Sequence, residues 1–284
     1  MAITTFAAID IGSYEVSMKI FELSKKIGFR QLNDVRYRLE IGKGAYSSGR
    51  LEPEIVDSIC MILNDFSKMM KEFGVSDYRA CATSAFREMI NPLIVQEQIY
   101  CRTGIRVEIL SNAEQHFLGY KSIAAKEAGF KKMIQKGTAI LDVGGGGLQV
   151  SLFDKDTLVT TQNLKMGSVR IRERLKELEK ATTHYDQLIL EFIRNDLTAF
   201  QRLYLKEREI KNVILMGDFL TDTMYFVSEF SGSASCKYNA YPVTAFLISN
   251  TCVLSGHNFI AYIKKYKGHQ CAFLLFMHIY LIHF

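Results

Sequence analysis

The chain has 284 residues, of which 48% are apolar and 23% charged, as in a globular protein with a substantial core. Its formal charge of +5 does not by itself indicate a nucleic-acid partner, although it is compatible with a polyanionic ligand. The six cysteines form no Cys-x-x-Cys pair and no zinc-ligand pattern, which argues against a zinc module and favours a reducing, cytoplasmic compartment. No secretory signal is visible, and the apolar run 271–284 is shorter than the ~20 residues that a membrane-spanning helix needs.

The first informative segment is an apolar run that ends in an aspartate and a glycine. Phe6 to Ile9 reads as a buried strand, Asp10 follows it, and the alternation after Gly12 predicts a returning strand. Glycine lets backbone N–H groups approach phosphate oxygens, and an aspartate can hold a hydrated divalent cation beside them. The segment therefore predicts a phosphate-binding hairpin, with Asp10 as a metal ligand and Gly12, Ser13 and Tyr14 in the turn. The alternative for Asp10 is an ordinary turn residue.

Alternating helices and strands follow. Pro53 and the apolar spacing after it predict a helix to about Phe73, and Pro92 starts another helix. Short strands are expected over 78–83 and 107–110, and a further helix over 112–128. This alternation predicts βα crossovers and a mainly parallel core beside the opening hairpin. Thr83, Ser84 and Arg87 lie just after a strand end, where ligands of parallel sheets gather, and a guanidinium binds phosphate in a bidentate manner.

The same pattern of strand, aspartate, glycine-rich turn and returning strand then appears a second time. Residues 139–143 form an apolar run containing Asp142, four glycines follow at 144–147, and 148–152 alternate as a returning strand. Four consecutive glycines exceed what one hairpin turn requires, so Gly144, Gly145 and Gly146 are candidates for close phosphate approach. A long helix over about 182–206 and a buried strand over 213–217 complete the pattern. Repetition of this pattern predicts two related lobes, the second beginning near residue 129.

Five segments in order resemble the exopolyphosphatase / guanosine pentaphosphatase (Ppx/GppA) family of the actin–hexokinase–Hsp70 superfamily. They run from residue 6 to about residue 220: 6–13, 79–87, 107–120, 140–146 and 165–169. The resemblance implies an α/β, two-lobed, actin-like ATPase (ribonuclease H-like) fold with a cleft between its lobes, an N-terminal lobe over 1–128 and a second lobe over 129–284. It further implies a hydrolase of terminal phosphoanhydride bonds in polyphosphate or guanosine pentaphosphate, with Mg²⁺ held by Asp142 and Asp10. No nucleic-acid or membrane partner is expected, and a homodimer stays open.

The departures from the family pattern concern the chemistry. Where the family has its expected catalytic glutamate this chain has Gln115, and where it has a glutamate near metal and water this chain has Gln149. An amide can orient a water but cannot take its proton near neutral pH, which predicts a slow enzyme. Asp142, Gln115 and Gln149 are thus the catalytic candidates. The alternative is an impaired member that only senses polyphosphate or a guanosine alarmone; a kinase-like ATP enzyme is disfavoured by the order of the five segments.

The remaining expectations are specific to single residues. Tyr14 replaces an asparagine of the family, so it either stacks on a base or ribose or narrows the cleft. His116 is expected at the surface, and Lys165 with Arg170 as a basic wall for a polyanion. The family loop after the last strand is altered at Phe219-Leu220, and the tail beyond about residue 228 is atypical. Two explanations stand for that tail: a truncated or frame-shifted end, which would leave the second lobe incomplete, or a divergent helix on the core.

Overall fold

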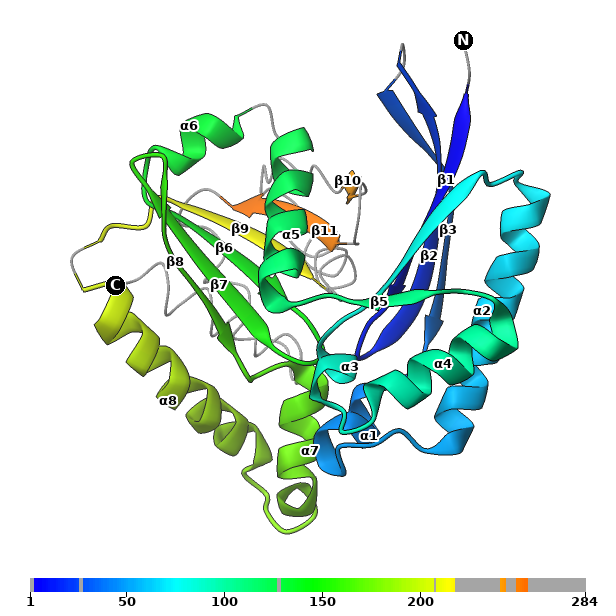
Figure 1. Ribbon diagram of the computed structural model, residues 1–284. Coiled ribbons are helices and arrows are strands. Elements are labelled where there is room, and N and C mark those ends of the chain that lie inside the picture. The colour runs from blue at the N-terminus through cyan, green and yellow to red at the C-terminus, as the bar shows by residue number, and fades with distance from the viewer. Residues whose placement is uncertain are drawn as a thin grey trace, which may run out of the picture. The chain divides into compact units, whose positions relative to one another are not determined.

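The fold consists of two compact units. The computed structural model describes residues 3–25, 28–126, 129–206, 208–217, 241–243 and 249–254. One unit comprises Met1–Ser122 with Val243–Ile248, and the other comprises Ile123–Pro242 with Ser249–Phe284. Each is built on its own mixed sheet with helices against it (Figure 1). The predicted α/β class with two ribonuclease H-like sheets is confirmed.

The sheet of the first unit opens with an antiparallel meander and continues with parallel strands. Its order is β3-β2-β1-β4-β5. The first three strands pair antiparallel, whereas β4 runs parallel to β1 and β5 runs parallel to β4. The carboxyl ends of β1, β4 and β5 therefore meet at one edge, where ligands of such sheets bind. The strands are β1 (Thr4–Ile11), β2 (Glu15–Ser24), β3 (Gly28–Arg38), β4 (Asp77–Ala82) and β5 (Val107–Ile109).

Two long helices cover one face of this sheet. Proline in the first turn of both α2 and α4 suits a helix start, because the missing N–H would have no partner there. Apolar side chains of α2 such as Ile59, Leu63 and Phe66 pack with Ile9 and Met18 of the sheet in one buried core. Figure 1 shows α2 and α4 beside each other on this face. The helices are α1 (Gly42–Ser47), α2 (Pro53–Glu72), α3 (Ser84–Glu88), α4 (Pro92–Thr103) and α5 (Asn112–Lys126), of which α5 continues into the second unit from Ile123.

The second unit repeats the meander and the first parallel strand. Its sheet has the order β10-β11-β9-β6-β7-β8, with β6, β7 and β8 antiparallel and β9 parallel to β6. The next strand differs from its counterpart in the first unit, because β11 pairs antiparallel with β9. Residues of α8 such as Ile193 and Leu197 pack on Leu141 and Val150. The elements are α6 (Phe130–Ile134), β6 (Thr138–Val143), β7 (Leu148–Asp154), β8 (Thr157–Leu164), α7 (Ser168–Glu179), α8 (Tyr185–Tyr204), β9 (Asn212–Gly217), β10 (Tyr241–Val243) and β11 (Ser249–Leu254).

The sequence predicted the long elements and the short strands β4 and β5 well, but it missed the shortest helices. Helices α2, α4 and α8 and the strands that precede each glycine-rich turn lie where expected, within a few residues. Helices α1 and α3, of six and five residues, are too short for an apolar period to be visible. The loop after β9 with Phe219-Leu220, and the tail apart from β10 and β11, fall outside the described residues. Among the helices described, none is both long and apolar enough to cross a membrane.

Candidate functional site

The first glycine-rich turn places a carboxylate next to a tight backbone reversal. Asp10 lies near the end of β1 and pairs with Ser17 of β2 and with Cys81 of β4. The N–H of Gly12 donates to the Glu15 carbonyl at 2.9 Å. A Cβ added to Gly12 would lie 3.1 Å from that carbonyl oxygen and 3.6 Å from Asp10 Oδ2. One oxygen of Asp10 thus lies beside the turn, which is the arrangement that a metal or phosphate role requires.

Three hydroxyl groups form a closed set of contacts at this turn. Ser13 Oγ lies 2.6 Å from the Tyr46 hydroxyl and 2.8 Å from Ser84 Oγ, and the Tyr46 hydroxyl lies 2.9 Å from Ser84 Oγ. Ser13 belongs to the turn, Tyr46 to α1 and Ser84 to the start of α3. The structure therefore brings together Ser13 and Ser84, as predicted candidates, with a tyrosine that sequence reasoning missed. The only signal for Tyr46 was its place shortly after Gly42 and Gly44, and α1 itself was not predicted.

Thr83 lies directly beside the turn. Its N–H donates to the Ile11 carbonyl at 3.3 Å, continuing the parallel pairing of β1 and β4. Thr83 precedes α3 as its N-cap residue, but its hydroxyl makes no capping hydrogen bond. Its side chain is buried, with 9% of the residue exposed. Strand pairing rather than helix capping thus determines where Thr83 lies.

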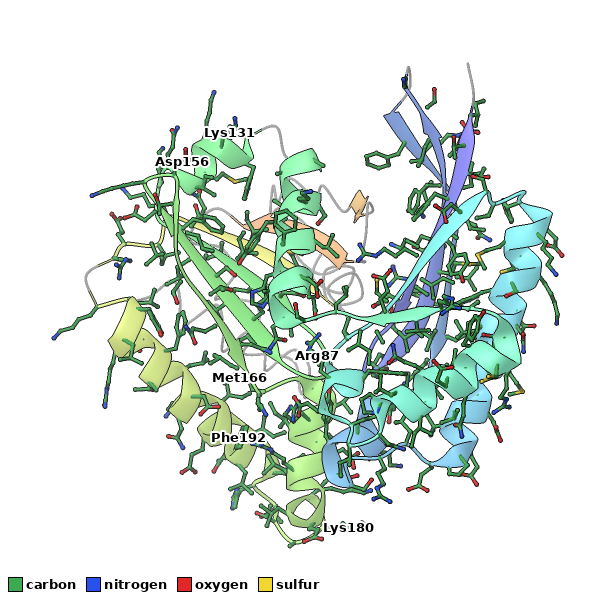
Figure 2. The ribbon with its side chains drawn as sticks, viewed as in Figure 1. Arg87, Lys131, Asp156, Met166, Lys180 and Phe192 are labelled. Atoms are coloured by element: carbon green, nitrogen blue, oxygen red, sulfur yellow. The ribbon has the colours of Figure 1, made fainter. Side chains whose placement is uncertain are left out.

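Arg87 and Gln115 are in direct contact. Arg87 Nη1 donates to Gln115 Oε1 at 3.1 Å and to the Leu110 carbonyl at 2.7 Å. Burial lowers the pKa of the Arg87 guanidinium, although an arginine stays protonated at neutral pH. Figure 2 labels Arg87 on α3. Because Gln115 Oε1 accepts from a cation, its amide nitrogen is directed to the other side, and the residue presents a donor there.

The neighbours of Gln115 have structural roles. Glu114 Oε2 accepts from the N–H of Ser111 at 2.8 Å, and Ser111 Oγ accepts from the N–H of Glu114 at 3.2 Å, which is a capping box at the start of α5. The backbone hydrogen bond from Ser111 lowers the pKa of Glu114. The expectation of a surface histidine was wrong, because His116 is buried with only 6% of the residue exposed. Its ring centroid lies 6.4 Å from that of Tyr120, one helical turn along α5, so this face of the helix points inward.

Tyr14 lies in the turn but its ring is covered. The residue is 8% exposed, and the guanidinium carbon of Arg38 lies 4.7 Å from its ring centroid. Arg38 Nη2 also donates to Glu40 at 2.8 Å. The Tyr14 carbonyl accepts from the N–H of Leu39 at 3.0 Å, which fixes the turn to the end of β3. The aromatic ring therefore stacks on a protein cation in this unit.

In the second unit three polar residues form a row across adjacent strands. Asp142 of β6 is paired with Gln149 of β7, and Gln149 is paired with Asn163 of β8. Directly opposed residues of antiparallel strands project to the same face with Cβ atoms ~5 Å apart. Burial raises the pKa of Asp142 to about 6. Sequence reasoning missed Asn163, because it lies in β8, a strand that was not predicted.

The glycine-rich turn of this unit is docked on the start of α7. The N–H of Gly144 donates to the Gly147 carbonyl at 3.0 Å, which closes the turn. The Gly145 carbonyl accepts from the N–H groups of Val169 and Arg170 at 3.0 and 3.1 Å. Arg170 Nε donates to the Gly146 carbonyl at 2.6 Å.

The predicted basic wall is wrong for Arg170. Only 4% of this residue is exposed, since its side chain reaches under the turn to Gly146. Lys165, the other residue of that expectation, is exposed. Met166, which precedes α7, is fully buried and labelled in Figure 2.

The donor set suits Mg²⁺ held together with a substrate. Within the described part of the chain no group of three or more His, Cys, Asp or Glu side chains could hold a metal alone. Each unit offers one aspartate beside its turn, Asp10 or Asp142. Mg²⁺ keeps several waters and binds through one or two carboxylates plus substrate phosphates, so single aspartates of this kind fit it.

Comparison with known proteins gives one consistent family. The model of the Ppx/GppA phosphatase family matches residues 20–270. Exopolyphosphatase 2 of Mycobacterium tuberculosis is 26% identical over 186 residues, covering 61% of this chain and 56% of that protein. A guanosine-5'-triphosphate,3'-diphosphate pyrophosphatase of Photobacterium profundum is 23% identical over 170 residues, covering 60% of this chain and 33% of that protein. The match thus spans about half or less of these relatives' length.

Solved structures show the same fold. A Ppx/GppA enzyme of Aquifex aeolicus superposes with a TM-score of 0.65 at 17% identity, covering 99% of this chain and 94% of that one. A second structure of the Aquifex aeolicus family member gives a TM-score of 0.60 at 20% identity, with 82% and 72% covered. At these identities the likeness bears on the fold alone.

Proposed function

The chain belongs to the Ppx/GppA phosphatase family, and from that premise we propose that it slowly hydrolyses the terminal phosphoanhydride bond of inorganic polyphosphate or of guanosine pentaphosphate. The observation that carries this proposal is the repetition of one pattern, once in each sheet: a strand with an aspartate next to its last residue, a glycine-rich turn and a returning strand. The names of the relatives, exopolyphosphatase and guanosine polyphosphate pyrophosphatase, support the two substrate classes. Buried free thiols at Cys60 and Cys81 suit a cytoplasmic setting.

Phosphate binding in the first unit would rest on hydroxyl groups and one guanidinium. Ser13, Thr83 and Ser84 provide hydroxyls at the end of the parallel strands, and Arg87 provides a fixed cation. A half-buried guanidinium attracts an anion more strongly than an exposed one, because solvent screens it less. In the second unit the backbone at Gly145 and Gly146 would play this part through N–H groups, whereas the N–H of Gly144 donates to the Gly147 carbonyl and so shapes the turn.

A bound Mg²⁺ would neutralise charge that develops on the transferred phosphoryl group. Asp142 and Asp10, each beside the turn of its own unit, are the carboxylates that would bind such an ion. Because burial raises the pKa of Asp142 to about 6, its carboxylate is mostly ionised at pH 7 and becomes protonated on mild acidification. A nearby cation favours the ionised form further.

The two glutamines would orient the attacking water. Water attacks the terminal phosphorus, the bond from phosphorus to the bridging oxygen breaks, and the shortened chain leaves. Neither amide can take the proton of the water, so that proton passes to a phosphate oxygen of the substrate. General-base assistance typically contributes ~10²–10⁴-fold, and its loss accounts for the slowness we propose. Phosphoryl transfer depends mainly on positioning and electrostatics, so activity need not vanish.

The test is the effect of Asp142→Ala on the Mg²⁺ dependence of binding. Tripolyphosphate is titrated into each protein with and without Mg²⁺, and we expect the metal to strengthen binding to the unmodified chain and to the control but not to Asp142→Ala. Asp154→Ala, at the far end of the same hairpin, is the control. Binding by a folded Asp142→Ala variant that still responds to Mg²⁺ would show that the metal lies elsewhere.

The second candidate is a non-catalytic sensor of polyphosphate or of a guanosine alarmone. Two observations favour it: both expected glutamates are amides, and Gln115 already accepts a hydrogen bond from Arg87. Phosphate release and ligand binding measured on one preparation separate the two candidates. Binding with no phosphate release over days, at any Mg²⁺ concentration, identifies the sensor.

A further inference from the structure

Arg170 is an unusual residue for its position because a cationic side chain is buried beneath a turn made only of glycines. It lies in the first turn of α7 and is 4% exposed. A buried cation is strongly destabilising unless hydrogen bonds compensate it. Here Nε donates to the Gly146 carbonyl at 2.6 Å, and the backbone N–H of the same residue donates to the Gly145 carbonyl at 3.1 Å. One residue therefore binds two successive carbonyls of the turn.

The direction of these carbonyls decides the direction of the amides. In a trans peptide the C=O and the next N–H point to opposite sides of the chain. The carbonyls of Gly145 and Gly146 face α7 and Arg170, so the N–H groups of Gly146 and Gly147 face away from them. Two successive N–H groups pointing to one side form a concave site that binds anions.

We propose that Arg170 is a positioning residue that aims the Gly146 and Gly147 N–H groups at a phosphate by holding the Gly146 carbonyl on the opposite side. This inference rests on the proposed function, since it names how the same turn binds its ligand. Glycine has little intrinsic preference among backbone conformations, so a run of four glycines does not keep its peptides oriented by itself. A peptide that turned over would direct a carbonyl oxygen, instead of an N–H, toward the phosphate.

The packing of α7 supports the same reading. A Cβ at Gly167 would overlap the backbone nitrogen of Gly147 and the carbonyl of Gly145. The start of α7 is thus in close contact with the residues on either side of Gly146, and it leaves the Gly145 carbonyl no room to move toward the helix. The N–H of Val169 also donates to the Gly145 carbonyl, so the free donors at the start of the helix are used to fix the turn.

Two substitutions separate the hydrogen bond from the packing. Arg170→Gln keeps an N–H donor at the chain position of Nε, whereas Arg170→Met reaches the same position with a methyl group and offers no donor; both lack the guanidinium charge. Tripolyphosphate affinity is measured by calorimetry, and the Gly146 amide is followed by NMR of the glycine-labelled chain, assigned through Gly146→Ala. We expect Arg170→Met to weaken binding about tenfold to hundredfold and Arg170→Gln much less, as for loss of a hydrogen bond to a charged group. Arg172→Met, two residues along and exposed at its side chain, is the control.

Each outcome gives a distinct answer. Equal losses in the methionine and glutamine variants, or binding by Arg170→Met as tight as that of the unmodified chain, would overturn the positioning role. If Arg170→Met gives no cooperative unfolding transition, Arg170→Gln is assessed alone: an unmoved Gly146 amide signal supports the role and a displaced one contradicts it. If tripolyphosphate moves no glycine signal of the unmodified chain, the proposed function fails. In that case a ligand-free Gly146 signal that shifts in Arg170→Met but not in Arg170→Gln supports the positioning role of Arg170, and any other result contradicts it.

Discussion

In the first unit the turn after β1 is fixed by side-chain hydroxyls, whereas in the second unit the turn after β6 is fixed by a helix backbone and a guanidinium. The counterpart elements are the helices that follow the third strand, α1 and α7. Gly42 of α1 donates its N–H to the Ser13 carbonyl at 2.8 Å, just as α7 donates to Gly145. Beyond that shared contact, Tyr46 binds the hydroxyl of Ser13, while Arg170 binds a carbonyl.

The difference follows from the composition of each turn. The first turn has a serine side chain that a neighbour can bind, and so its anchor is a tyrosine. The second turn has no side chains at all, so only its carbonyls can be held, and an arginine donates to one of them. A turn of four glycines lets a phosphate approach its backbone closely, but surrounding residues must hold the conformation of that backbone.

The largest expected effect is on the free energy of unfolding, when the glycine that lies against each turn is replaced by alanine. Gly167→Ala would force a methyl group into backbone atoms of Gly145 and Gly147, which cannot move away cheaply. At Gly42 an added Cβ would lie 2.6 Å from the Tyr46 ring, a side chain that can rotate. We expect Gly167→Ala to lower the free energy of unfolding by about 3–5 kcal/mol and Gly42→Ala by about 1–2 kcal/mol. Urea unfolding measures both.

The control for this pair is Gly74→Ala, where no atom lies near the added Cβ but φ is +60°. This variant reports the backbone cost alone. If Gly167→Ala destabilises no more than Gly42→Ala, the close docking of α7 on the second turn is not as described.

The next effect concerns the buried carboxyl of Asp142. Its pKa is about 6 when folded and near 3.8 otherwise, so between these pH values the folded state holds a proton that the unfolded state has released. Stability from this group is therefore lost as pH rises from about 4 to about 6. Asp142→Asn should raise the free energy of unfolding at pH 7.5 by up to about 3 kcal/mol, with little gain at pH 4.

The measurement is urea unfolding of both proteins across this pH range without Mg²⁺. Asp65→Asn, which removes one exposed charge, serves as the control. A stability difference between Asp142→Asn and the unmodified chain that stays constant with pH would contradict the raised pKa.

The third prediction compares the two glutamines. Gln115→Glu places a carboxylate 3.1 Å from Arg87 Nη1, so ion pairing would lower its pKa and make it a weak base. Gln149→Glu places a carboxylate opposite Asp142, so like charges would raise the pKa of both until Mg²⁺ binds. The double variant should release phosphate from polyphosphate about 100-fold faster than the unmodified chain, and each single variant should gain less.

A steady-state phosphate-release assay with and without Mg²⁺ decides this. Gln98→Glu, at an exposed position of α4 outside the candidate site, controls for added negative charge. An unmodified chain that already turns over as fast as the double variant would show that the glutamines do not impair catalysis.

The smallest effect concerns the hydroxyl anchor. Tyr46→Phe removes one member of the three-hydroxyl set, but Ser13 and Ser84 stay in contact at 2.8 Å. We expect a loss of about 1 kcal/mol in the free energy of unfolding and a smaller drop in tripolyphosphate affinity than for Arg170→Met. Tyr100→Phe on the exposed side of α4 is the control. A drop in affinity equal to that of Arg170→Met would mean that the two anchors are equivalent.

The repeated pattern of strand, aspartate, glycine-rich turn and returning strand, and with it the class of fold, could be predicted from the sequence alone. Apolar runs of strand length, each ending in aspartate and glycine, identify Asp10 and Asp142 because a buried strand and a tight turn leave a local pattern. The order of the five family segments fixed the family, and the amides at Gln115 and Gln149 could be read directly. Long helices such as α2 and α8 were visible because their apolar period extends over several turns.

Only the tertiary structure decided which side chains meet. The contacts of Ser13 with Tyr46, of Arg87 with Gln115 and of Arg170 with Gly146 join residues 24 to 33 positions apart, and no local pattern encodes them. Burial of His116 and Arg170 also depended on what packs against α5 and α7, whereas each residue by itself reads as polar and exposed. The chemistry of each side chain is known from the sequence, but the direction and the surroundings of that side chain depend on elements that meet only when the chain folds.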